Sequence, residues 1–351
     1  MWDWRRHVSP ETRLTELEAP LILEGGQRLE RVQVAWRSWG ALAPTRDNVV
    51  VVCHALTGSA DIDGWWSGLL GPGRAFDPDR DYVVCANVLG GCYGSTGPTS
   101  VNPATGRPWG PDFPEVTVRD MVAAQVAWAR QQGWRGISAV AGGSLGGMLA
   151  LEWALMAPDL VRALVPIATG AASAPWSIGF SEAQRQAIAA DDAWQGGRYD
   201  PDRPPVRGLA AARMLAMCTY RSPRNFERRF GRQTRDDGLF QVASYLRHQG
   251  ERLVERFDPL SYVRIGQALD SHDVARCRGT ARDVLGAVAA PALVVSIPSD
   301  ALIPEEEQRA LVQALPAARL GVLHSPDGHD AFLIEQAGLD RMIRAFRDSM
   351  R

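Results

Sequence analysis

The sequence predicts an α/β protein in which helices cover a mostly parallel sheet. From residue 48 onward, short β-branched runs alternate with segments of helical spacing, and such runs are typical of strands buried on both faces. The same alternation resumes after residue 290, once a long segment without strand patterns has ended. These two observations indicate one α/β core that an insertion interrupts.

The first expected strands are residues 48–53 (NVVVVC) and 82–88 (YVVCANV). A helix is expected over 116–130, where apolar residues recur at helical spacing and Gly133 follows the last turn. The next three elements, in chain order, are a strand over 137–141, a helix over 145–156 and a strand over 161–168. Alternation of this kind is typical of a parallel sheet.

Residues 171–290 contain helical periodicities and Pro/Gly breaks but no convincing strand. This segment holds 18 of the 38 arginines and 14 of the 40 acidic residues, so its net charge is +4 and that of the rest is −6. We therefore expect a core made of residues 1–170 and 291–351, with a basic helical insertion over 171–290. The core is expected to resume with a strand over 291–297, a helix over 305–315, a strand over 320–324 and a final helix over 331–350.

All 38 basic residues other than histidine are arginine, and the sequence has no lysine. This excludes a lysine Schiff base, a Walker-type phosphate-binding lysine, a kinase-type strand lysine and a Ser-x-x-Lys acylation site. With 46% hydrophobic and 22% charged residues, the composition suits a globular protein with a substantial core. A net charge of −2 is not the basic balance of a nucleic-acid-binding protein.

The N-terminal residues lead into polar sequence, and no stretch approaches the roughly 18 apolar residues of a membrane span. We therefore expect a cytoplasmic protein that does not bind a membrane. The five cysteines are odd in number and widely spaced, without a Cys-x-x-Cys pair. Neither a disulfide framework nor a thiolate zinc site is indicated, and no metal site is expected.

Residues 142–146 read GGSLG and fit the pattern G-x-S-x-G between an expected strand and an expected helix. Small glycines permit a sharp turn that exposes the Ser144 hydroxyl above the sheet. Unpaired N–H groups at the start of the following helix would face a developing oxyanion. Ser144 is therefore the candidate nucleophile, and the alternative is an ordinary Gly-rich turn.

A serine nucleophile needs a histidine base that a carboxylate orients. Asp300 follows the expected strand 291–297 and His329 follows the next strand, so both lie at the carboxyl edge of the sheet. We predict Asp300 as the acid and His329 as the base. The alternatives are a turn residue for Asp300 and a solvated loop residue for His329, with His324 as a second candidate base.

The loop after the first central strand begins with His54 and is a usual source of an oxyanion-binding N–H group. We expect the N–H groups of Leu56 and Leu145 to form the oxyanion hole. His54 is expected to orient this loop, with a catalytic role as the minor alternative.

Beyond these residues, the sequence resembles the homoserine O-acyltransferases of methionine biosynthesis, usually homoserine O-acetyltransferases, over nearly its whole length. The matching segments are 54–60 (HALTGSA), 87–114, 141–154 (AGGSLGGMLALEWA), 181–194, 211–232 and 327–335 (DGHDAFLIE). The resemblance implies an α/β-hydrolase core with a helical lid, and a homodimer formed through the lid helices. Leu145 stands where Met is usual and Leu149 where Gln is frequent, but position 145 would contribute only its backbone N–H.

The resemblance also implies that Ser144 is the acylated residue, that Asp300 and His329 are its partners, and that Arg213 and Asp330 contact homoserine. An amino-acid substrate presents a carboxylate and an ammonium, which suit a guanidinium fork and a carboxylate. The alternative for Arg213 is a salt bridge within the lid. Arg221 is a second candidate for the substrate carboxylate or a CoA phosphate.

The expected reaction is a ping-pong transfer of an acetyl group from the co-substrate acetyl-CoA to the side-chain hydroxyl of L-homoserine. No bound cofactor is expected. The alternatives are succinyl-CoA as the donor, serine as the acceptor, an esterase or hydrolase on the same fold, and a non-catalytic binding module.

Overall fold

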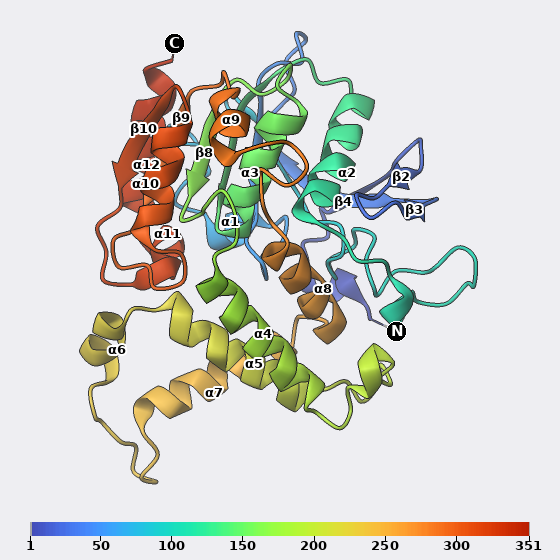
Figure 1. The fold of residues 1–351 in the computed structure, drawn as a ribbon, viewed down its shortest axis with the longest axis vertical. Coiled ribbons are helices and arrows are strands. Elements are labelled where there is room, and N and C mark those ends of the chain that lie inside the picture. Colours follow the sequence, from blue (N-terminus) through green and yellow to red (C-terminus); the bar gives the residue numbers. More distant parts are fainter. Residues whose placement is uncertain (1, 351) are drawn as a thin grey trace.

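An eight-stranded sheet forms the centre of the molecule (Figure 1). The structure is a computed structural model that describes residues 2–350. Five neighbouring pairs, from β6 through β5, β7, β8 and β9 to β10, are parallel, whereas β1 and β4 pair antiparallel at one edge. In spatial order the strands are β1 (Arg13–Glu16), β4 (Gln33–Trp39), β6 (Tyr82–Ala86), β5 (Val49–Cys53), β7 (Ile137–Gly143), β8 (Leu164–Ile167), β9 (Ala292–Ser296) and β10 (Ala318–Val322).

Helices cover both faces of this sheet, and the alternation of side chains along β5 shows how. Val49, Val51 and Cys53 belong to one hydrophobic cluster, and Val50 and Val52 belong to the other. The first cluster includes residues of α2 (Val118–Gln131), α3 (Leu145–Met156), α9 (Ala281–Gly286) and α10 (Glu305–Ala314). The second includes residues of α1 (Ile62–Trp65), α11 (Ala331–Ile334) and α12 (Gln336–Asp348). The predicted α/β fold class is confirmed.

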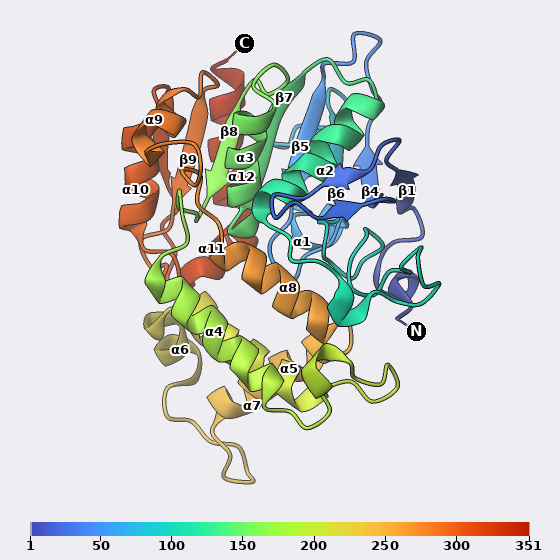
Figure 2. The same ribbon diagram turned by 45° about the vertical axis from the view of Figure 1, so that its right-hand side comes forward.

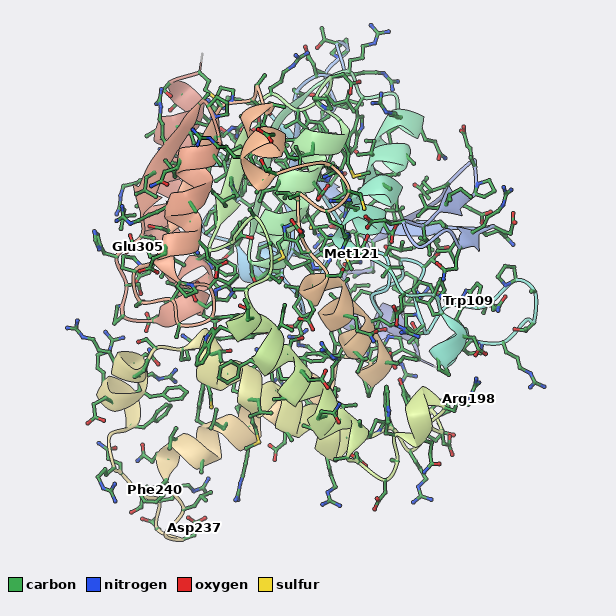
Figure 3. The ribbon with its side chains drawn as sticks, viewed as in Figure 1. Trp109, Met121, Arg198, Asp237, Phe240 and Glu305 are labelled. Atoms are coloured by element: carbon green, nitrogen blue, oxygen red, sulfur yellow. The ribbon has the colours of Figure 1, made fainter. Side chains whose placement is uncertain are left out.

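A group of helices lies below the carboxyl edge of the sheet (Figures 1 and 2). Its helices are α4 (Pro175–Ala189), α5 (Val206–Tyr220), α6 (Pro223–Phe230), α7 (Gln241–Val254) and α8 (Pro259–Asp270). The chain enters and leaves this group side by side, because Ala172 and Asp273 form an antiparallel bridge. The outer tip is the α6–α7 loop, where Figure 3 labels Asp237 and Phe240.

These helices lie within the predicted insertion (171–290), between the two parts of the predicted core (1–170 and 291–351). We propose that they cover the sheet edge as a lid, and we call this group the lid. Helix α9 falls inside the predicted insertion but packs on the core helix α10. Helix α4 and helix α7 pack on either side of α5. None of the helices within residues 2–350 is long and apolar enough to span a membrane.

The structure adds strands that the sequence analysis did not predict. These are β1 and β4 at the antiparallel edge and the separate pair β2 (Leu21–Ile22) and β3 (Arg28–Leu29). The predicted final helix over 331–350 is wrong as one element, because it is divided into α11 and α12 at Glu335, whose ψ is 45°. The Gln336 side chain donates to the carbonyls of Leu333 and Trp65, both at 2.9 Å, and holds this break against α1.

Candidate active site

The turn between β7 and α3 holds Ser144 in a backbone conformation that few non-glycine residues adopt, with φ 57° and ψ −122°. Its N–H donates to the Ile167 carbonyl of β8 at 2.9 Å, so the turn is tied to the neighbouring strand. The side chain is largely buried, with 8% of the residue exposed. The turn therefore presents a constrained serine at the carboxyl edge of the sheet.

The glycines around Ser144 allow the end of β5 to approach the start of α3. A Cβ atom added to Gly146 would lie 2.2 Å from the Cys53 carbonyl oxygen, and one added to Gly142 would lie 2.7 Å from the same oxygen. On the other side, a Cβ atom at Gly143 would lie 2.6 Å from the ring of Phe332. A larger residue at these positions would displace backbone or an aromatic ring, which explains the glycine-rich sequence physically.

Asp300 and His329 form a buried pair at the same edge. The carboxylate Oδ2 of Asp300 lies 2.6 Å from Nδ1 of His329, and its Oδ1 accepts the N–H groups of Leu302 at 2.8 Å and Ile303 at 2.9 Å. Asp300 therefore has a fixed orientation and can hold the His329 ring with the proton on Nδ1. The other ring nitrogen, Nε2, is buried and has no hydrogen-bond partner within residues 2–350.

The pKa of His329 is raised above its ordinary value of 6.5 by its surroundings. Burial acts in the opposite direction and lowers it, but the charge of Asp300 and the hydrogen bond to it outweigh burial, and Asp330 adds a smaller contribution. A raised pKa strengthens His329 as a base, but it also means that the ring is protonated, and cannot accept a proton, at slightly acidic pH.

Phe332 links His329 to the Ser144 turn. Its ring packs on Gly143, the residue before Ser144, and meets the His329 ring edge-on with centroids 5.7 Å apart. Tyr220 of α5 contacts His329, with ring centroids 5.8 Å apart. Within the described residues the Ser144 hydroxyl makes no hydrogen bond, and catalytic hydrogen bonds commonly tighten only when substrate is bound.

The two predicted oxyanion-hole residues lie on different segments, Leu145 directly after Ser144 and Leu56 in the loop after β5. Leu145 is the first residue of α3, so its N–H has no acceptor within the helix. Leu56 and Ser144 line one cavity of about 50 Å³, which also contacts α4, α5, α8 and α10. This volume has room for a few water molecules or a small acyl group.

His54 holds the loop that contains Leu56. Its Nε2 accepts the Val88 N–H at 3.2 Å, and its Nδ1 lies 2.8 Å from the Ala55 carbonyl oxygen. The first contact needs an unprotonated Nε2, so Nδ1 carries the proton and donates to Ala55. Burial lowers the pKa of His54 to about 4, which keeps the ring neutral. This geometry agrees with the expected orienting role of His54.

Arg213 and Asp330 lie on opposite sides of the junction between the lid and the His329 loop. The Arg213 guanidinium stands over the Tyr220 ring, 5.4 Å from its centroid, and makes no ion pair within residues 2–350. Asp330 is buried, and its Oδ2 lies 3.3 Å from Nε of Arg221, too poorly aligned for a hydrogen bond. Burial raises the pKa of Asp330, against the charges of Arg221, Arg213 and His329, which lower it.

The loop carrying His329 is attached to the lid by contacts that the sequence analysis missed. The Ser222 hydroxyl donates to the Pro326 carbonyl, and the Asn225 amide donates to the Asp327 carboxylate. Arg228 donates to the same carboxylate oxygen at 3.2 Å. We call these residues, Ser222, Asn225, Arg228, Pro326 and Asp327, the lid clamp. Its partners are about a hundred residues apart in sequence, and no local motif indicates the pairing.

Gly328 lies within the same junction. Its φ is 73°, in the left-handed region, and an added Cβ atom would lie 2.6 Å from the Ser222 nitrogen and 2.8 Å from the Arg221 carbonyl carbon. Only glycine fits there without a backbone shift. His324, the alternative base, is exposed on the surface instead.

A sharp serine turn after a central strand, followed in the chain by an acid and a histidine at the same sheet edge, is the arrangement of the α/β hydrolases. The chain matches the family model described as alpha/beta hydrolase fold over residues 48–336, and it belongs to that family. It is 51% identical to the homoserine O-acetyltransferase of Chloroherpeton thalassium over 99% of this chain and 92% of that protein. Within the α/β hydrolases, it is therefore a member of the homoserine O-acetyltransferase family.

The similar solved structures include a homoserine O-acetyltransferase and also an esterase. The X-ray structure of homoserine O-acetyltransferase from Bacillus anthracis matches with a TM-score of 0.88 and 25% identity, over 97% of this chain and 98% of that one. The crystal structure of esterase E22 also matches with a TM-score of 0.88, at 27% identity, over 96% of this chain and 99% of that one. Acyl transfer and ester hydrolysis thus occur on closely similar backbones.

Proposed function

We propose that this protein transfers an acetyl group from acetyl-CoA to the side-chain hydroxyl of L-homoserine, giving O-acetyl-L-homoserine for methionine biosynthesis. The observation that carries the proposal is the 51% identity, over almost the entire chain, to a homoserine O-acetyltransferase. The buried pair of Asp300 and His329 at the edge that presents Ser144 supplies chemistry suited to that reaction.

In the first half-reaction, His329 Nε2 accepts the hydroxyl proton of Ser144 as the serine oxygen attacks the thioester carbon of acetyl-CoA. The carbonyl oxygen becomes an oxyanion, to which the N–H groups of Leu56 and Leu145 donate. The carbon–sulfur bond then breaks, and the CoA thiolate takes the proton from His329. Ser144 is left as an acetyl ester.

In the second half-reaction, His329 accepts the proton of the homoserine hydroxyl, whose oxygen attacks the acetyl ester. Collapse of the tetrahedral intermediate returns the proton to Ser144 and releases O-acetyl-L-homoserine. Arg213 would bind the substrate carboxylate and Asp330 the ammonium. The Arg221 guanidinium lies beside Asp330, so the ammonium would have to share or replace that partner.

A transferase must keep water away from the acetyl ester, and the lid over the sheet edge is the device we propose for this. The narrow cavity at Ser144, bounded by α4, α5 and α8, supports that role. A homodimer through the lid helices and a cytoplasmic location are further proposals. The first rests on the resemblance stated above, and the second on the pathway that homoserine and acetyl-CoA serve.

The test is to incubate the enzyme with acetyl-CoA, with and without L-homoserine, and to follow the release of free thiol. We expect release to require homoserine, and Ser144→Ala to form no acetyl-enzyme and to lose on the order of 10⁴-fold or more in turnover. Equal release without homoserine would support hydrolysis, as in the esterase of similar backbone. Normal turnover by Ser144→Ala would refute the acyl-serine mechanism.

A further inference from the structure

The cavity at Ser144 is acidic on one side. Glu307, in the first turn of α10, lines the same cavity as Ser144 and Leu56. Its carboxylate lies against the loop that follows β8, where a Cβ atom added to Gly170 would meet Oε2 at 2.4 Å. Figure 3 labels Glu305, the residue that begins this helix. The N-terminal turn of α10 therefore brings a half-buried acid into the cavity that an acyl group on Ser144 would enter.

The charge of Glu307 is not compensated by a neighbour. Glu305, two residues earlier, pairs with Arg309 at 2.7 Å, but Glu307 makes no ion pair or side-chain hydrogen bond within residues 2–350. The second acid of the lining, Asp270, is paired with Arg185 at 2.5 Å. No arginine or histidine is among the described residues that line the cavity. A negative group entering it would find one unpaired carboxylate and no cation.

We infer that Glu307 is an acyl-donor specificity residue, whose carboxylate disfavours acyl-CoA donors that end in a carboxylate, such as succinyl-CoA, and leaves neutral short acyl groups unaffected. The inference rests on the proposed function, because it concerns the acyl group on Ser144. The acetyl group ends in a methyl, whereas the succinyl group is two carbons longer and ends in a carboxylate. Placing two like charges in one small cavity is costly, and rejection of this kind is a common basis of specificity.

The charge of Glu307 depends on pH, and this allows an independent test of the inference. Burial raises the pKa of Glu307 to about 7, and the negative charges of Asp300 and Glu306 add to this effect. The other titratable groups around the cavity are Asp270 on α8, paired with Arg185 of α4, Tyr220 on α5, and His329 beside Asp300. Because the pKa is raised, Glu307 is mostly neutral at pH 6 and mostly ionised at pH 8.

The experiment measures kcat/KM for acetyl-CoA and for succinyl-CoA, each with saturating L-homoserine, between pH 6 and pH 8. Protonation of His329 affects both donors, so it cancels in the ratio of the two values. In the wild-type enzyme we expect the preference for acetyl-CoA to rise with pH. In Glu307→Gln, which keeps the size of the side chain, we expect the preference at pH 8 to fall about tenfold and its dependence on pH to disappear.

Glu306→Gln is the matched control, because it removes an exposed carboxylate from the same turn outside the cavity. It should keep the wild-type preference at pH 8 and a rise of that preference with pH, with the rise moved to lower pH because the Glu306 charge no longer raises the pKa of Glu307. An unchanged preference in Glu307→Gln, or a rise in KM for homoserine alone, would overturn the inference, as would a flat wild-type ratio. Failure of the wild-type enzyme to acylate homoserine with either donor would instead reject the proposed function.

Discussion

The turn carrying Ser144 and the loop carrying His329 lie at the same edge of the sheet, but different kinds of contact hold them. The Ser144 turn is enclosed by core backbone: the Cys53 carbonyl of β5 lies against Gly146, and Ile167 of β8 accepts the serine N–H. The His329 loop is attached to the lid through side chains, with Asn225 donating to Asp327. The Ser144 turn therefore belongs to the packed core, whereas the His329 loop depends on contacts with α6 of the lid.

Because of this difference, we expect changes in the two regions to affect the stability and the activity of the enzyme to different extents. A change that opens the Ser144 turn also disrupts the contact between β5 and α3, so it should affect folding of the whole core. A change at the lid clamp touches neither hydrophobic cluster and should move only the loop that carries His329, the proposed base. Small displacements of a catalytic group reduce the rate steeply, so the clamp should affect turnover more than stability.

The largest effects are expected when an alanine replaces a glycine in each region. Gly146→Ala would place a methyl group 2.2 Å from the Cys53 carbonyl oxygen, and we expect it to lose more than about 3 kcal/mol of unfolding free energy or to fail to fold. Gly328→Ala combines a positive φ with a contact of 2.6 Å to Ser222, and we expect a loss of about 1–3 kcal/mol. Its kcat should fall about a hundredfold, because the His329 loop must shift.

Urea unfolding and steady-state kinetics on the same preparations test this pair. Gly238→Ala is the control, since Gly238 has a φ of 81° in the outer lid loop with no atom within 4 Å of an added Cβ. It should show the strain of a positive φ without loss of activity. Full activity in Gly328→Ala, or wild-type stability in Gly146→Ala, would contradict the distinction between the two regions.

A smaller effect is expected from Asn225→Ala, which removes a donor to the Asp327 carboxylate inside the lid clamp. The Asp327 oxygen then keeps only Arg228 as a donor, and a hydrogen bond to a charged group contributes about 1.5–3 kcal/mol. We expect kcat to fall about tenfold, with KM for both substrates nearly unchanged, because the loop with His329 is less firmly held. Arg228→Ala is the control: Arg228 contacts the same oxygen from a side chain that is 58% exposed, and it should have less effect. Equal effects of the two variants would argue against a positioning role for Asn225.

The smallest effect concerns the acidic limb of the pH profile. Because the net effect of the surroundings raises the pKa of His329 above 6.5, kcat/KM should decline as the pH falls, with a midpoint above 6.5. Asp330→Asn removes the smallest of the charge effects that raise this pKa, so the limb should move to lower pH. A wild-type midpoint at or below 6.5 would show that burial affects the pKa of His329 more than Asp300 does. A shift to higher pH in Asp330→Asn would contradict the expected effect of the Asp330 charge on the same pKa.

Much of the fold and of the site could be predicted because local sequence determines it. The β-branched run ending at Cys53 and the glycines around Ser144 act within a few residues of the group they describe. Asp300 and His329 could be predicted because each follows a recognisable strand. The antiparallel edge of β1 and β4 was not predicted, because the mostly exposed strand Arg13–Glu16 has no apolar alternation strong enough to mark it. The lid clamp was missed because Asn225 and Asp327 are ordinary surface residue types until a helix from the lid covers the loop.

The sequence by itself determined the class of fold, the sharp turn at Ser144 and the family, since each depends on short-range sterics or on long stretches of matching residues. Only the tertiary structure decided which distant groups meet: Asp330 beside Arg221, the lid clamp on the His329 loop, and Glu307 in the Ser144 cavity. The physical reason is that local backbone preferences act along the chain, whereas the burial and charge of a side chain depend on what packs against it.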